Sequence, residues 1–207
     1  MKKDAYKKIA GRYDIFVEPL VKSLRAATVK MIPSRKGMRV LDVGCGTGTY
    51  LKFLKSNGYM AFGIDSSFAM MNIAKAKPEN NVRLLLGDAL NLPCSDSTFD
   101  LVTFFMVLHE MPETERITVF SEAKRVMKEN GRILVVDYLP GPIQSVKGYL
   151  LKLVITFYEI AAGLEHFKNY QNFLFCRGLY SLIEKNRLSV EKKKISTGGN
   201  IGLFLIR

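Results

Sequence analysis

The chain has 207 residues, which is enough for one sizeable hydrophobic core and too few for two. With 48% apolar, 24% charged and 11% aromatic residues and a mean hydropathy near zero, it predicts a globular protein and excludes a disordered tail, a collagen-like repeat and a bundle of membrane spans. Its three cysteines form no CxxC pattern or Cys/His cluster, so the sequence indicates neither disulfides nor a metal site. We expect a cytoplasmic protein, because no apolar stretch follows the basic N-terminal residues.

The net charge of +12 is concentrated at the two ends of the chain. Residues 1–37 carry ten Lys or Arg against three acidic residues, and residues 147–207 carry ten against four, whereas residues 38–146 are nearly neutral. This division predicts a neutral binding core with positive flanks that face an anionic membrane surface, an anionic substrate or nucleic acid. Solvated lysines that only maintain solubility remain the alternative.

The middle of the chain alternates short apolar runs with helical periods. We expect strands over residues 38–43, 61–65, 82–88, 100–107 and 132–139. Helices are expected around residues 49–57, 67–76 and 113–129, with Asn130-Gly131 ending the last of them. Apolar strands separated by helices predict a doubly wound, Rossmann-like α/β fold with helices on both faces of a mostly parallel sheet.

The pattern changes after Leu139. An apolar segment from Val146 to Leu164 predicts an amphipathic helix that covers the sheet, because its apolar residues recur at three- and four-residue steps. Lys152 and Glu159 within it argue against a membrane span. Residues 188–196 and 201–207 predict a terminal hairpin around Gly198-Gly199-Asn200. We therefore expect one domain over residues 1–207, with an N-terminal helical cap (1–37), a cofactor-binding core (38–139) and acceptor-side helices with the hairpin (140–207).

The first strand runs into a glycine motif, Gly44-Cys45-Gly46-Thr47-Gly48, at the start of a helix. Glycines permit positive φ and let the backbone approach a ligand closely, but the GxGxG spacing is that of neither a dinucleotide fingerprint nor a phosphate loop. Asp42, two residues before the first glycine, repels a pyrophosphate and attracts a cation. S-adenosylmethionine fits, since it has no phosphate and carries a sulfonium and an ammonium.

Two more acids follow predicted strands. Asp65 ends the second strand, where an acid can bind both ribose hydroxyls, and Asp88 ends the third, where an acid can accept from the adenine amino group. A single acid at such a place is usually a helix cap or a turn residue. Three of them in order at the carboxyl edge of the sheet favour a cofactor site.

These motifs resemble class I S-adenosylmethionine-dependent methyltransferases, most closely the ubiquinone/menaquinone biosynthesis and type 11 small-molecule group. The resemblance covers residues 38–138 strongly, through VLDVGCGTG, GIDSS, GDALNLP, FDLVTFFMVLHEM and GRILVVDY. It implies a seven-stranded sheet with an antiparallel terminal strand. It also implies that the cofactor is S-adenosylmethionine and that its binding residues are Tyr13, Asp42, Gly44, Cys45, Gly46, Gly48, Asp65, Ser66, Asp88, Ala89 and Phe105.

Two departures bear on the acceptor. The quinone enzymes usually continue the fourth strand into an Arg-Asn pair, where this chain has Leu108-His109-Glu110. The Asn/Asp-Pro-Pro-aromatic tetrapeptide of enzymes that methylate nucleic-acid amines is absent from the sequence. The resemblance thus leaves the quinone open and disfavours a nucleic-acid amine.

Methyl transfer from a sulfonium is an in-line displacement, for which positioning can suffice and a base is optional. His109 follows the fourth strand and is the candidate catalytic base, with a structural histidine as the alternative. Tyr138, His166 and Tyr170 are the candidate acceptor-binding residues. Cys45 is expected to pack inside the glycine loop.

We expect a small apolar or amphipathic acceptor, lipid-like or aromatic, and a protein that contacts anionic membranes peripherally through its basic flanks. Two alternatives stay open. One is an RNA methyltransferase that tracks phosphates with its basic ends, which we do not favour because no aromatic residues interleave with Lys192-Lys193-Lys194. The other is a cofactor-binding protein without turnover.

Overall fold

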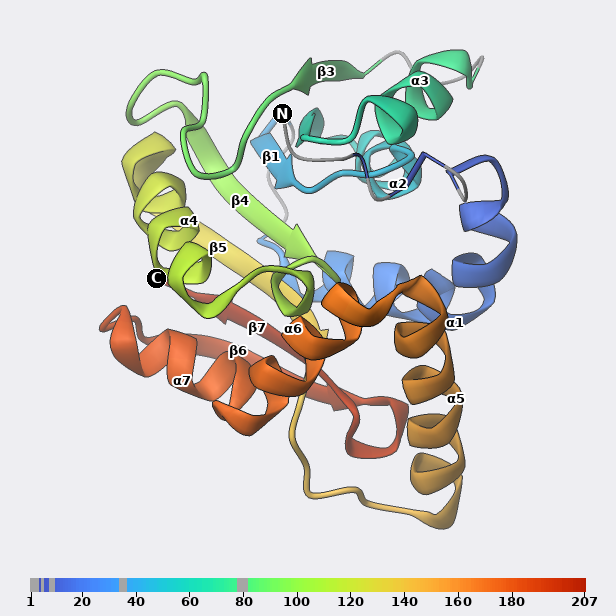
Figure 1. Ribbon diagram of the computed structural model, residues 1–207. Helices are drawn as coiled ribbons and strands as arrows, with labels where there is room; N and C mark the ends of the chain where they lie inside the picture. Colours follow the sequence, from blue (N-terminus) through green and yellow to red (C-terminus); the bar gives the residue numbers. More distant parts are fainter. Residues whose placement is uncertain (1–3, 5, 8–9, 34–36, 78–81) are drawn as a thin grey trace. The chain divides into compact units, whose positions relative to one another are not determined.

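The computed structural model describes residues 4, 6–7, 10–33, 37–77 and 82–207. Its seven strands form one sheet in the order β3-β2-β1-β4-β5-β7-β6 (Figure 1). The strands are β1 (Arg39–Val43), β2 (Met60–Asp65), β3 (Arg83–Leu86), β4 (Phe99–Phe105), β5 (Met127–Tyr138), β6 (Val190–Ser196) and β7 (Ile201–Ile206). Strand β2 pairs in parallel with β1 and β3, whereas β7 runs antiparallel to β5 and β6. The predicted mixed sheet and terminal hairpin are confirmed.

The chain divides into two compact units, and each is described by itself. The first comprises Met1–Thr103 and Glu122–Arg132. Its helices are α1 (Ala10–Met31), α2 (Thr49–Ser56) and α3 (Phe68–Ala76). Strand β1 is buried from Val40 onward, as its continuous apolar run predicts, whereas Leu85 and Leu86 of β3 are 40% and 52% exposed. Strand β3 lies at one edge of the sheet.

The second unit comprises Phe104–Ser121 and Ile133–Arg207. It contains the short η1 (Leu108–Glu110) and η2 (Thr197–Gly199) and the helices α5 (Val146–Ala162), α6 (Leu164–Phe175) and α7 (Gly178–Lys185). Strand β7 is buried along its whole length between β5 and β6. Strand β6 carries the exposed lysines at the other edge, where charged side chains discourage pairing with a second chain. Lys193 there lies over the rings of Tyr180 and Phe204.

The expected helix end at Asn130-Gly131 is wrong. Helix α4 (Glu113–Val126) ends four residues before Asn130, and both Asn130 and Gly131 lie in strand β5. The backbone N–H groups of Ser97 and Thr98 donate to the carbonyls of Arg125 and Val126, which satisfies the last carbonyls of the helix there. Gly131 is needed for packing instead, because a Cβ at this position would lie 2.3 Å from Cγ of Met127.

Helix α5 forms as predicted, but its predicted orientation is wrong. The buried residues of α5 are Gly148, Ile155 and Glu159. Glu159 accepts a hydrogen bond from Tyr138, and Gly148 packs so closely on the backbone of Gly198 that a Cβ would lie 2.5 Å from the Gly198 carbonyl oxygen. These contacts fix the inward face, and the apolar stripe expected on the sheet points outward. Among the described residues, no helix is both long and apolar enough to cross a membrane.

Candidate cofactor loop and histidine cluster

The glycine loop connects β1 to α2 in the first unit. Gly44, Gly46 and Gly48 have φ values of 75°, 52° and 74°, which a side chain would strain. The backbone N–H groups of Gly44 and Cys45 both donate to the carbonyl of Ile64 in β2, and the Cys45 side chain is buried. Apart from its chain neighbours Cys45 and Thr47, no described residue has an atom within 4 Å of where a Cβ of Gly46 would stand. The loop therefore presents open backbone to a ligand.

Asp65 joins this loop to the start of α3. One carboxylate oxygen accepts from the Gly46 N–H at 2.7 Å, and the other accepts from the Ser67 N–H at 2.8 Å, while Ser66 between them is exposed. Burial raises the pKa of Asp65, although these two backbone donors act in the opposite direction. The structure thus brings together two of the predicted cofactor-binding groups, the glycine loop and the acid at the end of β2.

Asp88 lies in the loop after β3 and is exposed. One of its carboxylate oxygens accepts from the Leu90 N–H at 2.9 Å, which is the turn interaction expected of an acid at this place. Ala89 beside it is half-buried. Because Asp88 is exposed, its carboxylate is accessible to a ligand amine.

Asp42 is only 2% exposed and accepts a hydrogen bond from the Thr103 hydroxyl at 2.6 Å. Burial raises the pKa of Asp42 to about 7, Asp65 adds to the rise, and the Thr103 hydrogen bond opposes it. At neutral pH this side chain is therefore near the midpoint of its titration. Its charge is available to a cation mainly above that pH.

We expect Asp42 to make the protein less stable as the pH rises. An acid whose folded pKa of about 7 exceeds its model value of 3.8 binds its proton more tightly in the folded state, so stability falls through the window between these values. The Asp42→Asn variant, which keeps an uncharged side chain, should gain about 2 kcal/mol over the wild type between pH 5 and pH 8. Urea unfolding of both proteins at several pH values in this range measures the difference in their free energies of unfolding. A difference that does not change with pH would contradict the raised pKa of Asp42.

Sequence reasoning missed a second set of polar groups at the glycine loop. Asp14 of α1 accepts from the Thr47 hydroxyl at 2.6 Å and from Nζ of Lys77 at 2.6 Å, and Lys77 also donates to the Thr47 carbonyl at 2.9 Å. The adjacent Tyr13 is half-buried and its ring lies 5.9 Å from that of Tyr6. The Tyr13-Asp14 pair was the available signal, but the hydrogen bonds of Asp14 join residues 33 and 63 positions apart.

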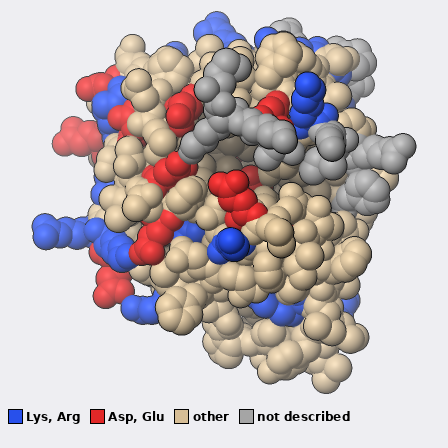
Figure 2. Space-filling model, viewed as in Figure 1, with Lys and Arg blue, Asp and Glu red and all other residues tan. Residues whose placement is uncertain are grey.

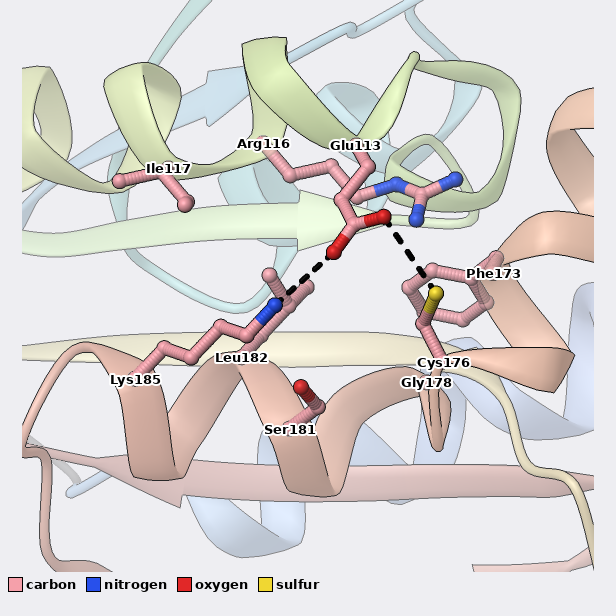
Figure 3. Close-up of a pocket in the computed structure, with 9 residues that line it drawn as sticks. All are labelled: Glu113, Arg116, Ile117, Phe173, Cys176, Gly178, Ser181, Leu182 and Lys185. Atoms are coloured by element: carbon pink, nitrogen blue, oxygen red, sulfur yellow. Dashed lines mark hydrogen bonds and ion pairs between the residues drawn. The ribbon is translucent and has the colours of Figure 1, made fainter.

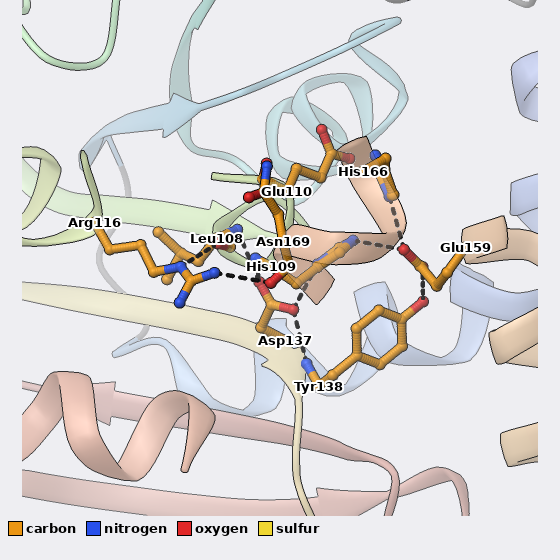
Figure 4. Close-up of polar contacts among 9 residues, drawn as sticks. All are labelled: Leu108, His109, Glu110, Arg116, Asp137, Tyr138, Glu159, His166 and Asn169. Carbon is orange, nitrogen blue, oxygen red and sulfur yellow. Dashed lines mark hydrogen bonds and ion pairs between the residues drawn. The ribbon is translucent and has the colours of Figure 1, made fainter. Parts of the chain in front are cut away.

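The second unit brings together the four residues predicted at the acceptor side, His109, Tyr138, His166 and Tyr170. Figure 4 shows the first three of them. The ring of His109 lies 4.6 Å from that of Tyr138 and 5.6 Å from that of His166, and the ring of Tyr138 lies 5.1 Å from that of Tyr170. They come from η1, β5 and α6. Phe105, at the end of β4, is half-buried.

Two buried acids that sequence reasoning missed hold this cluster. His109 Nδ1 lies 2.7 Å from Asp137, His166 Nε2 lies 2.7 Å from Glu159, and Tyr138 donates to the other oxygen of Glu159 at 2.8 Å. Burial opposes a charge on His109, but Asp137 and Glu159 outweigh it and raise the pKa of His109 to about 9. The His109 side chain is only 4% exposed and that of His166 is 17% exposed. His166 is therefore the more accessible of the two histidines.

Arg116 of α4 fastens the η1 segment to α6. Its guanidinium donates to the Leu108 carbonyl at 3.0 Å, to the Asn169 carbonyl at 3.0 Å and to the Asn172 side chain at 3.1 Å. It also lies 4.8 Å from the centre of the Phe173 ring. Arg116 is 2% exposed, so these contacts position the segment that carries His109.

A small depression lies beside Arg116 (Figure 3). It is crossed by a hydrogen-bonded pair, in which Lys185 donates to Glu113 at 2.9 Å, and Cys176 lies 3.4 Å from the other oxygen of Glu113. Its volume of about 10 Å³ accommodates about one water molecule. It is too small for an organic acceptor.

Comparisons with known proteins support a cofactor role for the glycine loop, because the matched region includes it. Residues 40–131 match the family model described as a methyltransferase domain. A demethylmenaquinone methyltransferase of Bacillus cereus is 31% identical over 160 residues, covering 72% of this chain and 67% of the relative. One from Thermobifida fusca is 32% identical over 146 residues, and the match spans 67% of this chain and 61% of that relative.

Solved structures show the same fold. A SAM-dependent methyltransferase from Aquifex aeolicus superimposes with a TM-score of 0.61 at 20% identity, covering 88% of both chains. An S-adenosylmethionine-dependent methyltransferase from Mesorhizobium loti gives 0.62 at 15% identity and covers 88% of this chain and 96% of its own. The chain belongs to the class I S-adenosylmethionine-dependent methyltransferases, in the group that includes the demethylmenaquinone methyltransferases.

Proposed function

We propose that this protein transfers the methyl group of S-adenosylmethionine to a small amphipathic acceptor, either quinone-like or lipid-like. The observation that carries the acceptor class is the outward-facing apolar stripe of α5, described below. When bound, S-adenosylmethionine supplies a methyl group on a sulfonium, which is transferred in line with the attacking atom. The chain's part is to bind, to orient and to exclude water.

The first unit fits this cofactor. The loop offers open glycine backbone, and the carboxylates of Asp65 and Asp88 offer acceptors to hydroxyl and amino groups. Asp42 adds a buried acid that is partly ionised at neutral pH. We assign the ribose hydroxyls to Asp65 and the adenine to Asp88 and Ala89, with Tyr13 and Ser66 of the same unit as further contacts. Acidic groups suit a cationic nucleoside and oppose a pyrophosphate.

The outward face of α5 supports an amphipathic acceptor. Val146, Leu153 and Phe157 are 80%, 67% and 70% exposed. The other exposed apolar residues of this stripe are Tyr149, Leu150, Val154, Ile160 and Leu164. Figure 2 shows mainly uncharged side chains over the region of α5. Such a contiguous apolar surface is typical of a binding surface, and the relatives are named for a quinone acceptor.

A label-transfer experiment tests the reaction. The protein is incubated with methyl-labelled S-adenosylmethionine and, separately, with demethylmenaquinone, a total lipid extract, a polar small-molecule extract and total RNA. We expect label in the quinone or the lipid sample. Label in RNA alone would favour the phosphate-tracking alternative, and label in no sample would favour a binding protein without turnover.

We further propose that the α5 stripe contacts an anionic membrane surface. Residues 147–207 carry an excess of six positive charges, and each well-placed Lys or Arg contributes roughly 1 kcal/mol to binding at such a surface. An interfacial helix needs an apolar face of this kind to enter the headgroup region. The positive charge and the exposed apolar area together favour an anionic membrane surface as the partner of α5.

The double variant Leu153→Ser/Phe157→Ser should bind vesicles of mixed phosphatidylcholine and phosphatidylglycerol about tenfold more weakly than the wild type. Its free energy of unfolding should change by no more than about 0.5 kcal/mol, because both side chains are exposed. Co-sedimentation at low salt measures the binding. Ile117→Ser, at an exposed apolar residue of α4, is the control, and equal binding by all three proteins would remove the membrane contact.

A further inference from the structure

We propose that His109, Glu159 and His166 form a binding site for a divalent transition-metal ion such as Zn²⁺. They are the only three-residue group of His, Cys, Asp and Glu with this spacing among the described residues, and their ligand atoms lie within 4.8 Å of one another. The chain has two histidines, and both belong to this group. The inference does not depend on the acceptor class.

The ligand set matches zinc chemistry. Two imidazole nitrogens and one carboxylate oxygen are a known three-residue zinc set, which leaves a fourth position for water. In a tetrahedral site the ligand atoms stand roughly 3.3 Å apart. Here Nε2 of His109 lies 3.7 Å and Nε2 of His166 lies 2.7 Å from the same oxygen of Glu159. Side-chain shifts of about an ångström would complete the site.

The groups behind the ligands point to the same conclusion. Asp137 is fully buried and holds Nδ1 of His109 at 2.7 Å, which turns Nε2 toward Glu159. A carboxylate behind a ligating histidine is the usual arrangement at metal sites, because it fixes the ring orientation and makes the nitrogen more basic. Tyr138 donates to the other oxygen of Glu159 and leaves the shared oxygen free for an ion. Two of the three ligands are therefore held in place by partners outside the site.

The charges are also suitable. Asp137 and Glu159 place two carboxylates in a buried region, and a divalent ion bound by neutral imidazoles would balance both. Lys152 of α5 is half-buried near Glu159, and its Nζ lies over the ring of Tyr170. The ion would join η1 to the consecutive helices α5 and α6, which begin more than thirty residues later in the chain, and so stabilise the second unit.

Metal binding is measured on the full chain, purified without a histidine tag and stripped with a chelator. We expect one Zn²⁺ per chain by calorimetry and by elemental analysis, and an intense visible absorption when Co²⁺ replaces it. The melting temperature should rise by about 5 to 10 °C at a free zinc concentration one hundred times the dissociation constant. Less than a tenth of an equivalent of bound zinc, with no thermal shift, would overturn the proposal.

Variants locate the site. His166→Ala should weaken zinc binding at least a hundredfold, since it removes one of three ligands from the most exposed position of the cluster. Glu165→Gln, at the exposed neighbour of His166, should bind zinc as the wild type does. Cys176→Ser tests adventitious binding to a thiol. Unchanged binding by His166→Ala, or loss in Cys176→Ser alone, would refute the assignment even if another variant failed to fold.

Discussion

Replacing Asp65 by alanine is expected to lower the affinity for S-adenosylhomocysteine at least a hundredfold. The wild-type carboxylate accepts the N–H groups of Gly46 and Ser67, so its loss leaves two backbone donors unpaired next to the glycine loop. If Asp65 binds the ribose as assigned, the substitution also removes the acceptor for the ribose hydroxyls. Charge-assisted hydrogen bonds of this kind contribute about 1.5 to 3 kcal/mol each, so two of them account for the expected loss.

Calorimetry with S-adenosylhomocysteine measures this effect. Asp96→Asn is the matched control, because Asp96 is an exposed acid whose side chain pairs with Arg125. Asp65→Asn should lie between the control and Asp65→Ala, since the amide retains one acceptor oxygen. An affinity of Asp65→Ala within threefold of the wild type would refute the ribose assignment, and tight binding of NADH would refute the choice of cofactor.

Arg116→Ala is expected to destabilise the protein by about 3 to 5 kcal/mol. The guanidinium is buried, and its removal takes one donor from each of the carbonyls of Leu108 and Asn169 and opens a cavity beside Phe173. The η1 segment loses its attachment to α6. We therefore also expect the environment of His109 to change.

Chemical denaturation gives the stability, and the NMR signals of the two histidine rings report the cluster. Arg116→Lys should recover only a small part of the loss, because an ammonium cannot reproduce the three-way hydrogen bonding of a planar guanidinium. Arg177→Ala, at an exposed arginine paired with Glu184, is the control. A destabilisation below about 1 kcal/mol would show that the buried contacts of Arg116 contribute little.

The candidate site was predictable in part. The glycine loop and Asp65 follow from local sequence, because each stands directly at the end of an apolar strand, and parallel strands bring those ends to one edge. The contacts of Asp14 with Lys77, of Asp137 with His109 and of Glu159 with Tyr138 carried no such signal. Lys77 lies 63 residues from Asp14, His109 lies 28 from Asp137 and Tyr138 lies 21 from Glu159, so only the folded chain shows which groups meet.

The two elements that prediction misplaced share this cause. Hydrophobic periodicity located α5 correctly but gave its apolar stripe to the core, whereas polar contacts of Glu159 and the close packing of Gly148 set the buried face. The Asn130-Gly131 pair predicted a helix end from a local rule. Instead α4 ends at Val126, where the N–H groups of Ser97 and Thr98, 28 residues earlier in the chain, donate to its last carbonyls.

By itself the sequence determined the order of the strands, the helices α2 to α5, the terminal hairpin and the glycine loop, whereas the mixed sheet was implied by the resemblance to the methyltransferases. Apolar runs and the spacing of glycines are local patterns of a few residues, and local sterics and hydrophobic burial are enough to interpret them. Only the tertiary structure decided which face of α5 is exposed and which side chains surround His109. Such contacts join distant segments, and their energies depend on burial and charge that no local pattern encodes.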